Sequence, residues 1–118
     1  MVATLGDGSY MFANPMVGHW VSAVQNLPIL TIVFNNSRYG AVRRATLSMF
    51  KDGVAGESDG RLLADLNPAP PYDEIARAQG AYAERVEKPA DLPDALTRAR
   101  DAVLDGRRQA LLNVITPY

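Results

Sequence analysis

The sequence predicts an α/β domain, a parallel sheet with flanking helices. Three observations carry this prediction. Short apolar, β-rich runs recur along the chain, segments with apolar residues at helical spacing separate them, and glycine, asparagine and proline mark the boundaries. Strands separated by helices of this length imply right-handed βαβ crossovers, and therefore parallel strands.

The first half of the chain contains two predicted strands with a helix between them. The apolar start at residues 2–5 indicates a strand, and the β-rich run at residues 29–34 indicates a second strand that is buried on both faces. Residues 15–25 can form the crossover helix. The apolar residues of this helix share one stripe that we expect to be buried, namely Met16, Val17, Trp20, Val21 and Val24.

The stretch from 44 to 71 is the least regular part of the sequence. It holds three glycines and three prolines, which predicts a loop with short helical pieces. Long loops in compact domains are often functional. We expect this one to cover a ligand or to meet another subunit.

The last part of the chain alternates again between helices and strands. We predict a helix at 72–79 that Gly80 ends, and strands at 81–87 and 110–115. Asp91 is the expected cap of a further helix that stops at Gly106. Apolar residues recur along that helix at Leu92, Ala95, Leu96, Ala99 and Val103.

Composition indicates one compact domain and argues against nucleic acid and membranes as partners. The chain has 118 residues, 47% hydrophobic and 21% charged, with a formal net charge of −1. Nucleic-acid binding needs clustered positive charge, so we expect no nucleic-acid partner. No apolar run has membrane-spanning length and no signal peptide is recognisable, so we expect no membrane partner and a cytoplasmic location. Cysteine is absent, which excludes disulfides and thiolate metal sites.

Two polar motifs follow the first two predicted strands. They are Gly6-Asp7-Gly8-Ser9 and Asn35-Asn36. The carboxyl ends of parallel strands meet at one edge of a sheet, where ligands bind in such folds. Carboxylate and amide oxygens suit Mg²⁺, and flanking glycines let backbone amides approach phosphate oxygens. The motifs predict a metal-diphosphate site, although Gly-Asp-Gly alone would equally fit a tight turn with an aspartate helix cap.

These residues resemble the thiamine-diphosphate-dependent enzymes, in particular the acetolactate synthase and benzoylformate decarboxylase group. The two motifs match, as does the continuation from Ser37 to Arg43, with its Tyr39-Gly40 pair, and the run 26–34 leads into the asparagines as in that family. The resemblance implies that residues 1–118 form the C-terminal domain that binds the cofactor diphosphate and magnesium. It further implies the thiamine-diphosphate-binding fold, truncated at its N-terminus and part of a longer enzyme.

The resemblance also implies roles for single residues. Asp7 and Asn36 would bind Mg²⁺ through their side chains and Arg38 through its carbonyl oxygen, while Asn35 would brace the turn. The implied cofactor-binding residues are Gly6, Gly8, Ser9, Tyr39, Gly40 and Ala41. No catalytic residue is assigned, because in this family the glutamate that activates the cofactor comes from a pyrimidine-binding domain, usually of the neighbouring subunit.

The function implied by the resemblance is the decarboxylation or carboligation of 2-keto acids with thiamine diphosphate and Mg²⁺, in a homodimer or homotetramer. Two alternatives stay open at this point. The chain could belong to a noncatalytic cofactor-binding or regulatory subunit. It could also be a nucleotide-binding α/β domain, which the lack of a complete Gly-x-Gly-x-x-Gly or Walker pattern disfavours.

Three other features have plain structural interpretations. His19 fits packing or an interface better than a general base, despite its suitable ordinary pKa. Arg43-Arg44 fits a solvated helix face better than a site for an acidic substrate. The remaining apolar cluster is expected to be core or subunit contact, with a part of it lining the thiazolium pocket as the resemblance allows; its residues are Met11, Phe12, Met16, Met49 and Phe50.

Overall fold

The structure, a computed structural model, describes residues 1–57 and 64–117. It divides into two compact units. The first comprises Met1–Asn36 and Pro71–Tyr118, and the second comprises Ser37–Pro70. Each unit is described by itself below.

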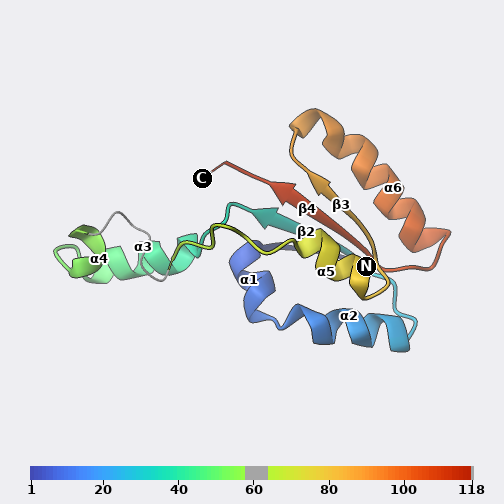
Figure 1. The fold of residues 1–118 in the computed structure, drawn as a ribbon, viewed down its shortest axis with the longest axis horizontal. Helices are drawn as coiled ribbons and strands as arrows, with labels where there is room; N and C mark the ends of the chain where they lie inside the picture. Colours follow the sequence, from blue (N-terminus) through green and yellow to red (C-terminus); the bar gives the residue numbers. More distant parts are fainter. Residues whose placement is uncertain (58–63, 118) are drawn as a thin grey trace. The chain divides into compact units, whose positions relative to one another are not determined.

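The first unit is built on a four-stranded parallel sheet (Figure 1). The strands are β1 (Val2–Gly6), β2 (Leu30–Asn35), β3 (Tyr82–Val86) and β4 (Ala110–Ile115), in the spatial order β1-β2-β4-β3. Every neighbouring pair is parallel. All four strands were predicted, and the parallel sheet confirms the predicted fold class.

One face of this sheet packs against α6 (Leu92–Leu104). Ala95, Ala99 and Val103 are buried against alternate residues of β4 such as Leu112, as the helical spacing predicted. Asp91 is the N-cap residue of α6, as predicted, but its side chain does not make the hydrogen bond expected of a cap. A 3₁₀ turn, η1 (Pro89–Asp91), leads into the helix, and Asp91 has a near-helical backbone (φ −84°, ψ −13°) without a capping hydrogen bond.

The other face carries α1 (Asp7–Phe12) and α5 (Tyr72–Ala78). The helix α2 (Pro15–Val24) packs in turn on α1 and α5. The sequence predicted one crossover helix between the first two strands, whereas the structure has two. Asn14 separates them because its backbone is left-handed, with φ at +50°. Gly80, at φ +83°, follows α5 as predicted.

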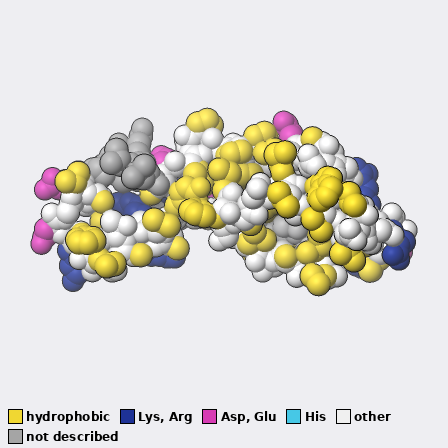
Figure 2. All heavy atoms as spheres, turned by 90° about the horizontal axis from the view of Figure 1, so that it is seen from below, with side chains coloured by type: hydrophobic (Ala, Val, Ile, Leu, Met, Phe, Trp, Pro, Cys, Tyr) yellow, Lys and Arg dark blue, Asp and Glu magenta, His cyan; other side chains and the backbone are white. Residues whose placement is uncertain are grey.

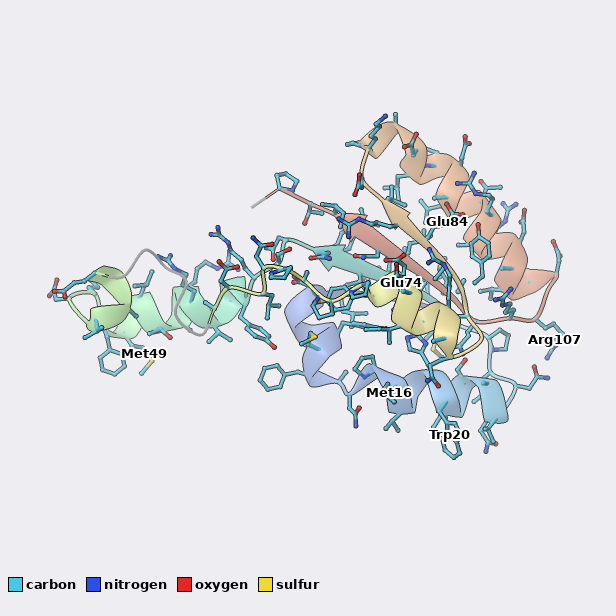
Figure 3. The ribbon with its side chains drawn as sticks, viewed as in Figure 1. Met16, Trp20, Met49, Glu74, Glu84 and Arg107 are labelled. Carbon is cyan, nitrogen blue, oxygen red and sulfur yellow. The ribbon has the colours of Figure 1, made fainter. Side chains whose placement is uncertain are left out.

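The predicted orientation of α2 is wrong. Its apolar residues were expected to be buried, yet Met16 and Trp20 are 57% and 58% exposed and point away from the sheet (Figure 3). The buried residues of α2 are instead His19 and Ser22. Hydrophobic side chains therefore gather on the surface over α1 and α2 (Figure 2). Met11 and Phe12 of α1 are exposed too. The expectation that they and Met16 belong to the core is therefore wrong.

The second unit contains α3 (Gly40–Met49) and α4 (Val54–Glu57). The predicted loop from 44 to 71 is thus wrong for residues 44–49, which continue α3, and right about a short helical piece further on. The part of that prediction at 58–63 lies outside the described residues. Arg44 is exposed on α3, as expected, and so are Met49 and Phe50, which are not core residues.

Candidate functional site

The register of β1 and β2 brings the two predicted motifs to one edge of the sheet. Gly6, the last residue of β1, pairs with Phe34 of β2. Asp7 therefore leaves β1 at the level where Asn35 ends β2, and Asn36 follows at the same edge. This register brings the acidic motif and the asparagine motif together at the carboxyl edge of the sheet, as predicted.

Asp7 is the buried acid of this edge. It is only 2% exposed, and its Oδ1 accepts a hydrogen bond from the backbone N–H of Gly8 at 2.9 Å. Gly6 has an ordinary extended backbone, with φ at −76°, and a Cβ placed there would meet nothing within 4 Å. This glycine is not required by a strained turn or by packing. Its missing side chain instead leaves open space beside the end of β1.

Asn35 is held by both its backbone and its side chain. Its carbonyl oxygen accepts from the N–H of Thr116 at 2.9 Å, and its Nδ2 donates to Oδ1 of Asn113 on β4 at 3.1 Å. Asn35 is 2% exposed and Asn113 is fully buried. Asn36, just beyond the strand, is half-buried. The side chain of Asn35 is thus part of the sheet interior, and Asn36 is the member of the pair placed beyond the strand end.

Tyr10 of α1 takes part in a second buried network behind the glycine motif. Its hydroxyl lies 2.7 Å from Nε2 of His19, and Nδ1 of His19 lies 2.8 Å from Oε1 of Gln109. The Nε2 of Gln109 donates to the carbonyl oxygens of His19 and Gln79, so its Oε1 is left as the acceptor. His19 must then donate from Nδ1, and the Tyr10 hydroxyl donates to Nε2. His19 is a packing residue, as the sequence indicated.

The titration of Tyr10 yields a testable pH dependence. Burial raises the pKa of Tyr10 to about 12, with a smaller contribution from the neighbouring Tyr72. The ordinary pKa of a tyrosine hydroxyl is 10.0. Between pH 10 and pH 12 the folded protein therefore keeps the Tyr10 proton that the unfolded chain has lost. The contribution of this hydroxyl to stability is complete below pH 10 and is lost as pH rises toward 12.

We expect Tyr10→Phe to remove this pH dependence. The free energy of unfolding of the wild type should fall between pH 9 and pH 12 by about 2 kcal/mol more than that of the variant, from roughly 1.4 kcal/mol per pKa unit. Urea unfolding of both proteins across this range measures the difference. Parallel pH profiles for the two proteins would contradict the assigned burial of the Tyr10 hydroxyl.

The remaining predicted site residues belong to the second unit. Ser37, with φ at +56°, turns the chain toward an antiparallel bridge between Arg38 and Asp65. The hydrogen bonds of this bridge are made by neighbours of Arg38: Tyr39 N–H donates to Ala64, and Leu66 N–H donates to Ser37. Neither bond uses the Arg38 carbonyl, the predicted metal ligand.

Tyr39, Gly40 and Ala41 form the start of α3. Tyr39 is the N-cap residue of α3. Its side chain makes no capping hydrogen bond, so it does not satisfy the first backbone N–H groups of the helix. The other α-helices with a described N-cap share this lack, and it therefore does not by itself mark a ligand site.

The sequence analysis missed the buried polar residues of the first unit. Gln109 directly precedes the apolar strand β4 and Asn113 lies in its middle, and polar residues in such places are the one signal that could have indicated buried polar networks. Nothing local distinguishes Asp73 from an exposed acid in the first turn of a helix. Its 5% exposure depends on tertiary packing that the sequence pattern does not encode.

Among residues 1–57 and 64–117, no three His, Cys, Asp or Glu side chains cluster as a metal site, so a cation here would need amide or carbonyl ligands.

No helix in this described part of the chain is long and apolar enough to cross a membrane.

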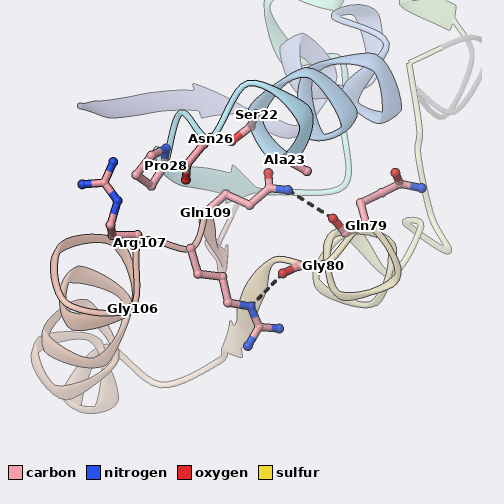
Figure 4. A pocket seen from close by; sticks show the side chains of 10 residues that line it. Ser22, Ala23, Asn26, Pro28, Gln79, Gly80, Gly106, Arg107 and Gln109 are labelled. Atoms are coloured by element: carbon pink, nitrogen blue, oxygen red, sulfur yellow. Dashed lines mark hydrogen bonds between the residues drawn. The ribbon is translucent and has the colours of Figure 1, made fainter.

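A pocket of about 310 Å³ lies at the opposite end of the sheet, near the starts of β2, β3 and β4 (Figure 4). Pro28, Gly80 and Gln109 contribute to its lining, and none of the predicted site residues does. Hydrogen bonds from Gln109 to Gln79 and from Arg108 to Gly80 tie its walls together. The pocket is therefore separate from the predicted ligand edge.

An open parallel sheet with acidic and amide side chains at its carboxyl edge defines the class of ligand-binding α/β domains. Within that class the chain belongs to the family described as thiamine pyrophosphate enzyme, C-terminal TPP binding domain, whose sequence profile matches residues 1–114. This confirms the resemblance noted from the motifs.

Individual relatives agree with this membership. The chain is 30% identical over 117 residues to a probable acetolactate synthase of Mycobacterium bovis, covering 98% of this chain and 19% of that protein. It is 26% identical over 115 residues to a sulfoacetaldehyde acetyltransferase of Castellaniella defragrans, covering 97% and 17%. The chain thus spans about a fifth of the length of the curated relatives it matches.

A solved structure shares the fold. The thiamine diphosphate-dependent 4-hydroxybenzoylformate decarboxylase of Rhodococcus jostii RHA1 superposes with a TM-score of 0.73 at 22% identity, over 99% of this chain and 20% of that one. Together with the family match, this confirms the predicted thiamine-diphosphate-binding fold.

Proposed function

We propose that this domain binds Mg²⁺ and the diphosphate of thiamine diphosphate, as part of an enzyme that decarboxylates or carboligates 2-keto acids. The observation that carries the proposal is the β1–β2 register, which places buried Asp7 and the Asn35-Asn36 pair at one edge in a chain of this family. Asp7 and Asn36 offer a carboxylate and an amide oxygen, the hard oxygen ligands that Mg²⁺ prefers.

The residues present fit the metal and cofactor chemically. Asp7 supplies the negative charge of the proposed ligand set, and the space beside Gly6 leaves room for a ligand at the strand end. We assign the diphosphate to Gly6, Gly8 and Ser9 in the first unit. The roles of the Arg38 carbonyl and of Tyr39, Gly40 and Ala41 rest on the sequence resemblance alone, since these residues belong to the second unit.

Thiamine diphosphate would supply the carbon chemistry, and this chain would anchor it. Asp7 and Asn36 would hold the metal that neutralises the diphosphate, while backbone amides of the glycine motif would donate to its oxygens. We further propose that the activating glutamate comes from a pyrimidine-binding domain outside these 118 residues, in an oligomer. The relatives named as a synthase, a transferase and a decarboxylase support enzymatic rather than regulatory use of the fold.

Calorimetric titration of the natural polypeptide that contains this chain tests the proposal. We expect thiamine diphosphate to bind in the presence of Mg²⁺ and to lose most of its affinity in EDTA. ADP should fail to compete, because the site is proposed to recognise a metal-diphosphate together with the thiamine portion of the ligand. Equal affinity with and without Mg²⁺ would refute the metal site, and equal binding of ADP would favour a nucleotide-binding domain instead.

A further inference from the structure

A continuous chain of hydrogen bonds, buried beyond its first link, connects the surface of α5 to the end of β2. On α5, the exposed guanidinium of Arg77 donates from Nη2 to Oδ2 of Asp73 at 2.9 Å. Asp73 accepts at Oδ1 from Nδ2 of Asn113 at 3.1 Å, and Asn113 accepts at Oδ1 from Nδ2 of Asn35 at 3.1 Å. We refer to these four residues as the Asn113 relay.

The charge on Asp73 fixes the direction of every bond in the relay. A carboxylate only accepts hydrogen bonds, so the Asn113 side chain must present its NH₂ group to Asp73 and its oxygen to Asn35. Asn35 must then present its own NH₂ group to Asn113. Both amides are held in one orientation, because flipping either one would bring two donors or two acceptors together.

The relay lies in the interior of the fold, where this restriction has its strongest effect. Asn113 is 0% exposed on the central strand β4, and Asp73 and Asn35 are 5% and 2% exposed. An unsatisfied polar group at such a position is strongly destabilising, so alternative side-chain arrangements are disfavoured. Arg77 also donates from Nε to the carbonyl oxygen of Ala83. This bond connects α5 to β3, the outer strand of the sheet.

The relay ends at the residue next to a proposed metal ligand. Asn35 is held by its side chain through Asn113 and by its carbonyl through Thr116, both at β4 or just past it. Asn36 is joined to it by a single peptide bond, so the position of the Asn36 backbone depends on how Asn35 is fixed.

We propose that Asn113 and Asp73 are positioning residues for the Mg²⁺ site, acting through Asn35 on Asn36. This inference rests on the proposed function. A partner that hydrogen-bonds a metal ligand directly typically changes metal affinity by about 10- to 100-fold. Asn113 acts one residue further away, through Asn35, so we expect an effect at the lower end of this range. The relay therefore predicts a defect in Mg²⁺ affinity that excess Mg²⁺ repairs.

Asn113→Leu in the natural polypeptide tests the inference. Leucine has a similar size and removes both side-chain bonds of Asn113. We expect the Mg²⁺ concentration that gives half-maximal thiamine diphosphate binding to rise about 10-fold, with maximal binding retained at saturating Mg²⁺. Asp73→Leu interrupts the relay one link further out and should raise the same midpoint, which keeps the test available if Asn113→Leu does not fold.

Leu112→Val is the matched control, because Leu112 is buried on the same strand but packs toward α6. It should lower stability to urea and leave the Mg²⁺ midpoint unchanged. A midpoint that moves as much in Leu112→Val as in Asn113→Leu would overturn the relay, since lost stability alone would then explain the effect. An unchanged midpoint in folded Asn113→Leu would overturn it as well.

Asp7→Asn separates this inference from the proposed function. If Asp7→Asn abolishes Mg²⁺-dependent binding while Asn113→Leu binds Mg²⁺ like the wild type, the metal site stands and the relay inference fails. If the wild type binds thiamine diphosphate equally well in EDTA, the proposed function fails first and the relay inference with it.

Discussion

Replacing Asp7 with asparagine is expected to lower the affinity for thiamine diphosphate in Mg²⁺ by more than about 100-fold, beyond the range typical of supporting residues. The substitution keeps the size of the side chain and the Oδ1 atom that accepts from Gly8 N–H, and it removes the charge. Mg²⁺ is bound in proteins largely through carboxylates, so a neutral amide in this place should hold it poorly. Calorimetry at fixed Mg²⁺ measures the effect.

Asp105→Asn controls for the loss of one negative charge, because Asp105 is exposed at the C-terminal end of α6 and belongs to neither predicted motif. It should bind thiamine diphosphate like the wild type. An Asp7→Asn variant that retains full Mg²⁺-dependent affinity would contradict the assignment of Asp7 as a metal ligand.

Replacing His19 with leucine is expected to lower the free energy of unfolding by about 3–5 kcal/mol, because two buried polar atoms lose their partner. These atoms are the Tyr10 hydroxyl and Oε1 of Gln109, both bound to the imidazole. Leucine can fill part of the space but cannot accept from Tyr10 or donate to Gln109. Urea denaturation of the natural polypeptide measures the change.

A double variant tests whether the loss comes from the network. Tyr10→Phe removes the hydroxyl that His19→Leu would leave without a partner, so the two substitutions together should cost less than the sum of each alone, by about 0.5–3 kcal/mol. Strict additivity would show that Tyr10 and His19 do not depend on each other. An unchanged stability of His19→Leu would show that the buried network does not stabilise the fold.

The sequence predicted the sheet well because periodicity and strand burial have a direct physical connection. The strand β2 packs against α1 and α6 and most of its residues are buried, as an uninterrupted apolar run predicts, although Phe34 near its end is 44% exposed. The two polar motifs were located for a similar reason: residues just past parallel strands reach the same edge. The roles assigned to Asp7 and Asn36 stay predictions until a ligand is measured.

The orientation of α2 could not be read from the sequence. The apolar stripe of α2 predicted that this stripe faces the core. Burial depends on what each face of a helix contacts, and in the structure the buried face of α2 is the one that carries His19 and Ser22. Hydrogen bonds with Gln109, 90 residues away in the chain, satisfy the buried His19: its Nδ1 donates to Oε1 of Gln109, and its carbonyl oxygen accepts from Nε2 of Gln109. Long-range polar partners of this kind leave no local periodicity, so pattern analysis favoured the wrong face.

The helix boundaries near the site show the same limit. The predicted crossover helix at 15–25 corresponds to α2, whereas α1 before it was not predicted. Asn14 separates the two helices through a left-handed backbone, a conformation that asparagine tolerates but does not require. Asp91 fits the pattern of a capping residue, yet the proline-led turn before α6 already gives it a near-helical backbone. Sequence preference at such positions permits several geometries, and tertiary packing selects one.

The most direct measurement is a crystal structure of the natural polypeptide with thiamine diphosphate and Mn²⁺ in place of Mg²⁺, with the metal located by anomalous scattering. We expect one peak bound by the Asp7 carboxylate and the Asn36 side-chain oxygen, at about 2.0–2.2 Å, together with diphosphate oxygens. A cofactor bound with no metal at these two side chains, or a metal held by other residues, would contradict it.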